Sequence, residues 1–297
     1  MNASELRLGL DIGSTSVKAV VVEPEGNRLL WSDYRLHRSK QRAVAVDLLR
    51  SVANAFPRRR FRTAFAGSGA QPIADAAGAL YVQELPAAFC HVAAAYPQAQ
   101  MVLEVGGQDA KAFFLRKDSA GNSDLSDMRM NTRCAGGTGA FLDSVAGVLG
   151  IPPVELPTLA RGGRTVHRIS GRCGVFAKTD IRTLIAGGAD PADIAASTYE
   201  ALAKQIVGGL CAGAERSAPV LVAGGVFTFH GRLVEAIAQR LHLTPDQVLT
   251  AEDAHLVVAR GAALATKTIF GDRNQPIDLD ECLAAVQRID SSATTTR

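Results

Sequence analysis

Several features that mark common classes of protein are missing from this sequence of 297 residues. No apolar run approaches the length of a membrane span, and the N-terminus lacks the basic segment and apolar core of a signal peptide, so we expect no membrane partner. The 32 basic and 29 acidic side chains leave a net charge of +3, which is too small to predict a nucleic-acid partner. Five scattered cysteines, an odd number, argue against a disulfide framework and predict reduced thiols in the cytoplasm.

Two widespread nucleotide-binding patterns are also absent. No glycine-rich loop ends in Gly-Lys-Ser or Gly-Lys-Thr, so a P-loop is excluded, and no Rossmann fingerprint is present. The six histidines show no metal-ligand spacing. With 47% hydrophobic and 21% charged residues, the composition is that of a globular protein long enough for two domains.

The sequence does contain an internal repeat. Residues Leu8–Glu23 and Met101–Arg116 align without a gap, and in each copy two β-rich runs flank a turn of small residues. The matched pairs are Asp11 with Glu104, Gly13 with Gly106, Lys18 with Lys111 and Ala19 with Ala112. We interpret the repeat as a duplicated strand–turn–strand unit, one in each domain. The alternative is two unrelated hairpins with similar turns.

This interpretation predicts an α/β fold with two subdomains and a tail. The first subdomain covers residues 1–97 and the second covers 98–268, although the last helix of the second can pack back on the first. Residues 269–297 are expected to form a C-terminal extension that is partly disordered. Helical spacing predicts one long helix from Pro191 to about Ala212, and the polar segment Lys117–Ser126 is expected to be a loop.

In each repeat, an acidic residue and a glycine turn lie at the end of the first strand. Such a turn offers backbone N–H groups and hydroxyls to phosphate oxygens, and the acid can hold Mg²⁺ directly or through water. Two turns facing each other would clamp the phosphates of a nucleotide, whereas either alone can be an ordinary hairpin. A third glycine turn, Gly224-Gly225, follows the predicted buried strand Val220–Ala223. The candidate phosphate residues are Asp11, Gly13, Ser14 and Thr15 in the first turn and Gly106, Gly107, Gln108 and Asp109 in the second.

Two glycine-rich segments each hold one cysteine. Cys134 lies in Asn131–Leu142 and Cys173 lies in Ser170–Asp180. A helix that begins near Thr138 would aim free N–H groups and a positive dipole end at a nearby thiolate or cluster. Two thiols are too few for a four-thiolate site, but a symmetric dimer would supply four. The alternative is tight helix packing around small thiols, which is how we interpret the remaining cysteines in apolar helices, Cys90 and Cys211; Cys282 lies in the tail.

Taken together, these motifs resemble a known superfamily. The paired turns and the late Gly-Gly turn are similar to those of the actin, Hsp70 and sugar-kinase ATPases, which implies a duplicated ribonuclease H-like fold. The two cysteine segments resemble those of the BadF/BadG/BcrA/BcrD family, and the resemblance runs from about Leu8 to Ala265. That family contains activators of 2-hydroxyacyl-CoA dehydratases and ATPase subunits of benzoyl-CoA reductase.

The resemblance implies an ATP-driven electron donor. One [4Fe-4S] cluster would bridge a homodimer, or a pair with a paralogous subunit, through Cys134 and Cys173 of each chain. Asp11 would lie near Mg²⁺, and Gln108 or Asp109 would orient the attacking water. The implied partners are an acyl-CoA dehydratase or aryl-CoA reductase component, with ferredoxin or flavodoxin as the electron source. Further residues implied at the ATP site are Gly137, Thr138 and Gly139, near both phosphate and cluster, and Gly224 and Gly225 around adenosine.

The chain departs from the family pattern after the last glycine pair. The run Val-Phe-Thr-Phe-His-Gly replaces the short Val-Ala-x-Asn run of smaller activators. Two other functions stay open. A small-molecule kinase, such as a sugar kinase, would use Asp109 as a base toward a hydroxyl but would leave the two cysteines unexplained. An Hsp70-like or actin-like scaffold would bind nucleotide without a redox centre.

Overall fold

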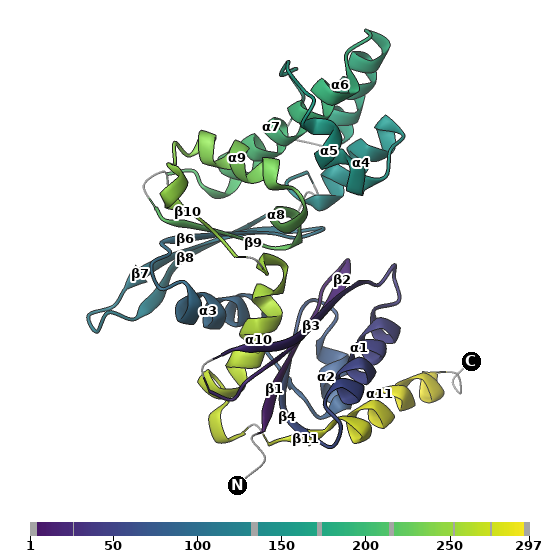
Figure 1. Ribbon diagram of the computed structural model, residues 1–297, viewed down its shortest axis with the longest axis vertical. Coiled ribbons are helices and arrows are strands. Elements are labelled where there is room, and N and C mark those ends of the chain that lie inside the picture. The colour runs from purple at the N-terminus through teal and green to yellow at the C-terminus, as the bar shows by residue number, and fades with distance from the viewer. Residues whose placement is uncertain are drawn as a thin grey trace. The chain divides into compact units, whose positions relative to one another are not determined.

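The computed structural model describes residues 5–25, 27–131, 136–170, 174–213, 217–251, 253–273 and 275–293. The chain forms two compact units, which are treated separately below (Figure 1). The first unit consists of Met1–Tyr96 together with Leu256–Arg297, and the second is Pro97–His255. Residues 256–268, which the sequence placed in the second subdomain with the option of packing back, therefore belong to the first compact unit.

A mixed sheet forms the centre of the first unit. Its strand order is β11-β4-β1-β2-β3, with β5 beside β4. Strands β1, β2 and β3 are antiparallel neighbours, while β4 runs parallel to β1. The strands are β1 (Leu6–Ile12), β2 (Ser16–Val22), β3 (Leu29–Leu36), β4 (Arg60–Ala66), β5 (Leu80–Tyr81) and β11 (Ile277–Asp278).

Helices cover both faces of this sheet. Alternate residues of β2 point to opposite faces: Val17 and Val21 pack with helices α1, α2 and α11, whereas Val20 and Val22 pack against α10. The helices are α1 (Gln41–Ala55), α2 (Gln71–Ala77), α3 (Glu84–Ala95), α10 (Val257–Thr268) and α11 (Leu279–Ala293), with a 3-10 turn η4 (Gly271–Arg273).

The second unit repeats the plan with a five-stranded sheet of order β10-β9-β6-β7-β8. Its strands are β6 (Met101–Val105), β7 (Ala110–Lys117), β8 (Ser123–Asn131), β9 (Val220–Ala223) and β10 (Val248–Thr250). Its helices are α4 (Gly139–Leu149), α5 (Leu156–Ala160), α6 (Gly174–Ala186), α7 (Pro191–Leu210), α8 (Gly225–Phe229) and α9 (Gly231–Arg240). Short 3-10 turns are η1 (Pro153–Glu155), η2 (Pro245–Gln247) and η3 (Ala254–Leu256). Helix α7 is the long helix that the sequence predicts.

Strand registers agree with the duplication inferred from the repeat. Asp11 lies directly opposite Lys18 across β1 and β2, and Glu104 lies directly opposite Lys111 across β6 and β7. In both units a further strand runs parallel to the first, β4 beside β1 and β9 beside β6. The matched residues of the sequence alignment thus occupy equivalent ladder positions.

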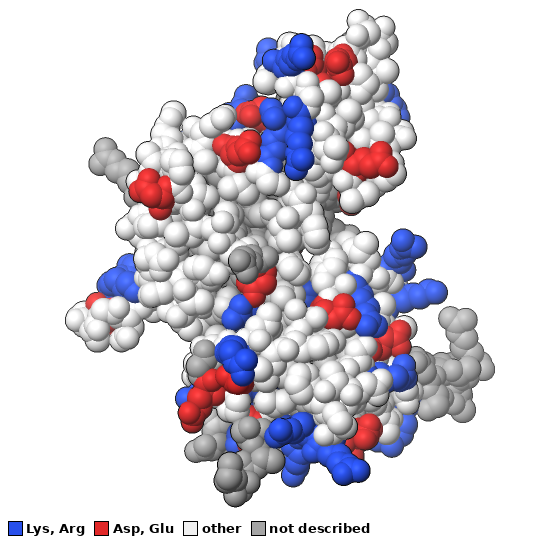
Figure 2. Space-filling model, viewed as in Figure 1, with Lys and Arg blue, Asp and Glu red and all other residues white. Residues whose placement is uncertain are grey.

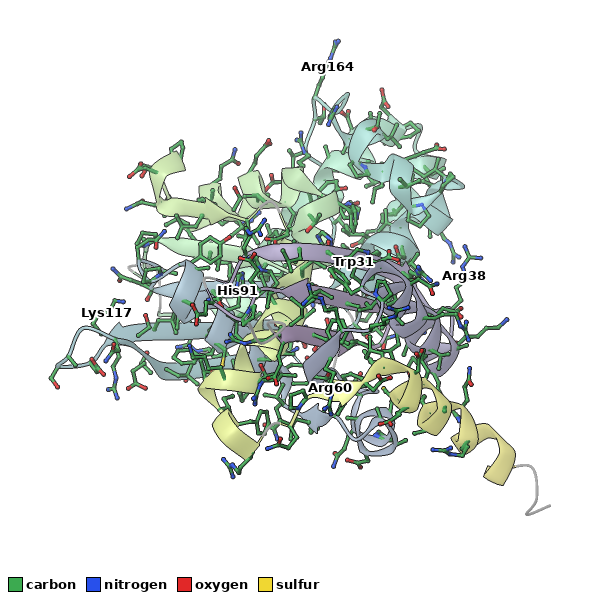
Figure 3. The ribbon with its side chains drawn as sticks, turned by 60° about the horizontal axis from the view of Figure 1, so that its bottom comes forward. Trp31, Arg38, Arg60, His91, Lys117 and Arg164 are labelled. Carbon is green, nitrogen blue, oxygen red and sulfur yellow. The ribbon has the colours of Figure 1, made fainter. Side chains whose placement is uncertain are left out.

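The expected loop Lys117–Ser126 is wrong at both ends, because Lys117 ends β7 and residues 123–126 begin β8. Strand β8 starts at Ser123 and pairs along its length with β7, whose last residue is Lys117 (Figure 3). Strand β8 lies at the sheet edge and most of its side chains are partly or fully exposed. Its polar residues therefore do not form the alternating apolar pattern from which a strand is predicted. Within the C-terminal extension, α11 buries Leu279, Cys282 and Val286 in the core of the first unit. Residues 274 and 294–297 lie outside the described residues.

Charge is mixed on the face in view in Figure 2, where basic and acidic side chains are interspersed. Among the described residues, no single helix is both long and apolar enough to cross a membrane. The helical segments Gly139–Leu149 and Pro153–Ala160 reach the length and hydropathy of a membrane span only when they are taken together, and they are bent by 97° relative to one another.

Helix α10 packs closely against α3 because of a glycine. A Cβ atom at Gly261 would lie 1.7 Å from the carbonyl oxygen of Ala87. No side-chain rotation relieves that overlap, because the position of a Cβ atom is fixed by its own backbone and the Ala87 oxygen is a backbone atom.

We therefore expect Gly261→Ala to lower the free energy of unfolding by about 2 kcal/mol or more, as overpacked cores do. The control is Gly147→Ala on α4, where an added Cβ has nothing within 4 Å and helix propensity predicts a gain of about 0.5–1 kcal/mol. Urea unfolding of both variants checks this, and equal midpoints for the two would contradict the close approach.

Candidate functional site

The first of the two candidate phosphate turns connects β1 to β2. The Asp11 carboxylate is almost fully buried and accepts a hydrogen bond from Lys18 Nζ at 2.8 Å. The Gly13 N–H donates to the carbonyl of Ser16 at 3.0 Å and closes the turn. In this described part of the chain, the following two N–H groups, of Ser14 and Thr15, make no hydrogen bond.

The second turn, between β6 and β7, repeats this arrangement. The Gly106 N–H donates to the carbonyl of Asp109 at 2.9 Å. Within the described residues of this turn, the N–H groups of Gly107 and Gln108 make no hydrogen bond. Lys111 Nζ lies 2.7 Å from Asp109 Oδ2 and 3.8 Å from Glu104 Oε2, so its ammonium pairs mainly with the turn itself.

Each turn therefore presents two successive free N–H groups, and such a pair forms an anion-binding concavity. The residues that fit a phosphate oxygen are Ser14 and Thr15 in one unit and Gly107 and Gln108 in the other. The N–H groups of Gly13 and Gly106 are used inside the turns, so these two glycines serve the turn conformation instead.

The carbonyl of Gly13 is held by side chains that the sequence analysis missed. His37 Nε2 lies 3.2 Å from that carbonyl oxygen, and Gln41 Nε2 donates to it at 3.1 Å. The N–H of Ser39 donates to His37 Nδ1, which leaves the proton on Nε2. The only sequence pattern that indicates this contact is the spacing of four residues between His37 and Gln41, just before and at the start of α1.

In the second unit the equivalent carbonyl is held by a helix. The N–H of Gly139 donates to the carbonyl of Gly106 at 2.9 Å, and the N–H of Ala140 donates to that of Gly107 at 2.8 Å. Helix α4 begins at Gly139, as predicted, but its first two N–H groups are not free to face a thiolate. That expectation was wrong, because the turn between β6 and β7 uses these donors. Thr138, fully buried and extended, precedes the helix, and a Cβ at Gly137 would lie 2.9 Å from Asn131 Nδ2.

A glycine of positive φ follows the parallel strand in both units. Gly224 has φ +96°, and a Cβ there would lie 2.4 Å from the carbonyl oxygen of Val105. Gly67 has φ +105°, and a Cβ there would lie 2.4 Å from the carbonyl oxygen of Ile12. Only glycine suits either position. The sequence singled out Gly224 and Gly225 but missed Gly67, whose signal was the same strand–glycine junction.

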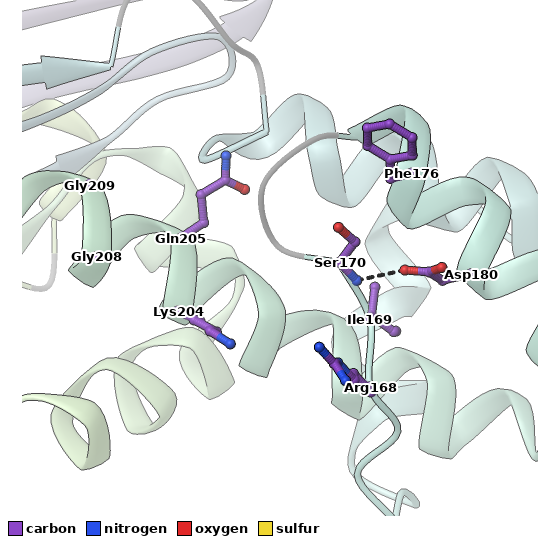
Figure 4. Close-up of a pocket in the computed structure, with 9 residues that line it drawn as sticks. All are labelled: Arg168, Ile169, Ser170, Phe176, Asp180, Lys204, Gln205, Gly208 and Gly209. Carbon is purple, nitrogen blue, oxygen red and sulfur yellow. Dashed lines mark hydrogen bonds between the residues drawn. The ribbon is translucent and has the colours of Figure 1, made fainter.

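The two candidate cluster ligands, Cys134 and Cys173, lie outside the described residues. Among those that are described, no group of three or more His, Cys, Asp or Glu side chains is arranged to hold a metal ion. The segment before Cys173 is fixed to α6, because the N–H of Ser170 donates to Asp180 Oδ2 at 2.8 Å (Figure 4). Both residues line a cavity of about 1030 Å³ in the second unit, together with Gln205 of α7.

The other cysteines differ from expectation in one case. Cys211 and Cys282 are buried, but Cys90 is only partly buried, and its Sγ lies 3.3 Å from Thr268 Oγ1. Burial raises the pKa of both Cys90 and Cys282, so neither thiol is activated.

Comparison with known proteins identifies the family. The model of the BadF/BadG/BcrA/BcrD ATPase family matches residues 8–266. The chain belongs to this family. It is therefore an ATPase, and the resemblance stated from the cysteine segments and glycine turns is confirmed.

Relatives match over most of their length. The (R)-2-hydroxyglutaryl-CoA dehydratase activating ATPase of Acidaminococcus fermentans is 25% identical over 249 residues, which cover 80% of this chain and 90% of the relative. The crystal structure of component A of that dehydratase has a TM-score of 0.77 at 25% identity, covering 88% and 97% of the two chains. One of the subunits of benzoyl-CoA reductase from Thauera aromatica is 28% identical over 233 residues, 76% of this chain and 79% of the relative.

A further solved relative contains a nucleotide. The activator of 2-hydroxyisocaproyl-CoA dehydratase from Clostridium difficile, with bound ADPNP, has a TM-score of 0.73 at 26% identity and covers 95% of this chain and 97% of its own. The predicted two-domain ATPase fold class is thereby confirmed.

A histidine next to the Gly224 turn gives this family member a testable pH dependence. His230 follows α8, and its Nδ1 shares a 2.7 Å hydrogen bond with the hydroxyl of the buried Tyr199. Burial lowers the pKa of His230 from 6.5 to about 4. The imidazole is therefore neutral in the folded chain at neutral pH.

As the pH falls through 6.5, the unfolded chain binds a proton that the folded chain does not bind until about pH 4. We expect the free energy of unfolding to fall over this window, and to fall less in His230→Asn, which has no proton to bind. Urea unfolding between pH 7 and pH 5 measures the two slopes. His230→Asn also alters the Tyr199 hydrogen bond at every pH, so the slope rather than the absolute value is diagnostic, and parallel slopes would contradict a neutral His230.

Proposed function

We propose that this chain is an ATP-dependent activator that passes a low-potential electron to an acyl-CoA dehydratase or aryl-CoA reductase component. Relatives with these names match the chain over most of its length, which supports the activator role. The electron would come from one [4Fe-4S] cluster bridging two subunits, with Cys134 and Cys173 of each as ligands. A cluster held by four thiolates matches the two cysteine segments of the sequence.

The observation that carries the proposal is the pair of hydrogen bonds from α4 to the second phosphate turn. Gly139 and Ala140 donate to the carbonyls of Gly106 and Gly107. Cys134 precedes Gly139 by only five residues. A shift of the turn on phosphate binding would therefore displace the start of α4, and with it the segment that carries Cys134. This link gives ATP a physical route to the cysteine.

The residues of the two turns would have separate roles in binding the nucleotide. Free N–H groups at Ser14, Thr15, Gly107 and Gln108 would bind phosphate oxygens. Asp11, held by Lys18, would accept a hydrated Mg²⁺, because that ion keeps most of its waters. Gln108 or Asp109 would orient the attacking water. Gly13 and Gly106 would shape the turns, and Gly137, Thr138 and Gly139 would connect phosphate to cluster, while Gly224 and Gly225 would border adenosine.

The assembly would be a homodimer or a pair with a paralogous subunit. Ferredoxin or flavodoxin would reduce the cluster, and the cytoplasm would keep its thiols reduced. When bound, the cluster supplies the electron, and ATP hydrolysis makes transfer unidirectional.

Oxygen-free purification tests the cluster directly. We expect a brown dimer with about four irons and four sulfides per dimer. Cys134→Ala and Cys173→Ala should each lose the iron, since each removes two of the four thiolates, and both should keep basal ATPase activity. Cys90→Ala is the matched control and should keep the iron. A colourless monomeric wild type with intact ATPase activity would refute the proposal.

Gly139→Ala tests the link through α4. An added Cβ would lie 3.1 Å from Val226 Cγ2, which can give by side-chain rotation, and 3.3 Å from Gly107 Cα and 3.4 Å from the Gly106 carbonyl oxygen, which are backbone, so the turn and the helix must move apart slightly. We expect the effect of ATP on the rate at which a chelator removes iron to be about fivefold smaller than in the wild type, the scale of a typical coupling energy. Gly147→Ala, on the same helix in open space, should leave that effect unchanged. An unaltered ATP effect in Gly139→Ala would show that the coupling runs elsewhere.

A further inference from the structure

Helix α8 ends in an exposed aromatic ring, that of Phe229. Helix α8 follows the Gly224 turn, and its side chains Val226 and Phe227 are buried in the core of the second unit. Phe229 is not part of that core and is 54% exposed. A Cβ atom at Gly225 would lie 4.0 Å from Phe229 Cε2, so the edge of the ring lies over the glycine turn itself.

A second ring lies beside it. The rings of Phe229 and His255 have centroids 6.1 Å apart and an interplanar angle of 39°. The N–H of Gly224 donates to the carbonyl of Ala254 at 2.8 Å, which ties the residue before His255 to the turn. Thr228 Oγ1 lies 3.5 Å from His255 Nδ1 and 3.3 Å from the Gly224 carbonyl oxygen. Two rings and a glycine turn thus form one small surface in the second unit.

The surface lies where a nucleobase would be expected. Strands β6 and β9 are parallel, and the turn at Gly224 follows the carboxyl end of β9. Ligands of open α/β sheets bind outside the carboxyl ends of the strands. An apolar, planar partner can cover the exposed part of a phenyl ring without displacing any hydrogen bond of that ring. Every base has a face on which an aromatic ring can stack.

We propose that Phe229, supported by His255, is the stacking platform for the base of the bound nucleotide and favours purines. A purine has two fused rings and covers more of the phenyl face than a pyrimidine. The proposal rests on the adenosine role proposed for Gly224 and Gly225, but it needs neither the cluster nor the dehydratase partner. It gives the departure Val226–Gly231 a function in this chain.

Calorimetric titration with ATP, CTP and inorganic tripolyphosphate tests the platform. In Phe229→Ala the affinity for ATP should fall about 10- to 100-fold, the range for the loss of one base–aromatic stack. The affinity for tripolyphosphate should stay unchanged, and the preference for ATP over CTP should shrink. Phe229→Trp is the conservative control and should keep both the ATP affinity and the preference. His255→Ala should cause a smaller loss, since it removes only the supporting ring.

Each other outcome overturns the proposal. Wild-type ATP affinity in Phe229→Ala would show that the ring does not touch the base. An equal loss of ATP and tripolyphosphate affinity would show that the ring only supports the fold of the turn, and an unfolding midpoint of the variant below that of the wild type would confirm this. If the wild type bound neither ATP nor tripolyphosphate, the proposed phosphate turns would fail as well, whereas iron analysis judges the cluster independently.

Discussion

The hydrogen bond from the Gly139 N–H to the Gly106 carbonyl is the contact on which the organisation of the second unit depends. It fixes the start of α4 on the turn between β6 and β7. The space at this point is fully used: a Cβ on Gly139 would lie 3.1 Å from Val226 Cγ2 as well as 3.3 Å from Gly107 Cα. Any larger residue would have to shift one of the three chain segments that meet there. Displacement of any one of these segments therefore shifts the other two.

The equivalent turns of the two duplicated units are held by different groups. In the first unit the Gly13 carbonyl is held by the side chains of Gln41, the first residue of α1, and of His37, which precedes α1 and whose N–H also donates to the carbonyl of Thr15. In the second unit the equivalent Gly106 carbonyl is held by the backbone of α4, next to a cysteine segment. A backbone donor cannot rotate away as a side chain can. The Gly106 carbonyl is thus bound to the start of a helix by a main-chain donor, whereas the Gly13 carbonyl is bound by two side chains.

Local patterns were enough to predict both hairpins, their common register and the start of α4, because each depends on residues close in sequence. Three of the features that escaped prediction did so for separate physical reasons. Strand β8 is an exposed edge strand without a continuous apolar face. His37 acts on Gly13 from 24 residues away. The N–H groups at the start of α4 are occupied by Gly106 and Gly107, a pairing set by the tertiary approach of α4 to β6 and β7. Cys134 and Cys173 keep the role inferred from sequence as a proposal.

Gly139 and Gly224 would together let one small region respond to both ends of a nucleotide. Gly224 lets β9 approach Val105 at the end of β6, and its N–H binds Ala254. The helix that follows it places Val226 against Gly139, while the same helix ends at Phe229. Contacts to a base at Phe229 and contacts to phosphate at Gly107 would therefore both act on the chain segments that surround Gly139. Because close-packed interiors transmit strain rather than absorb it, occupancy of both ends would constrain the start of α4 more tightly than either alone.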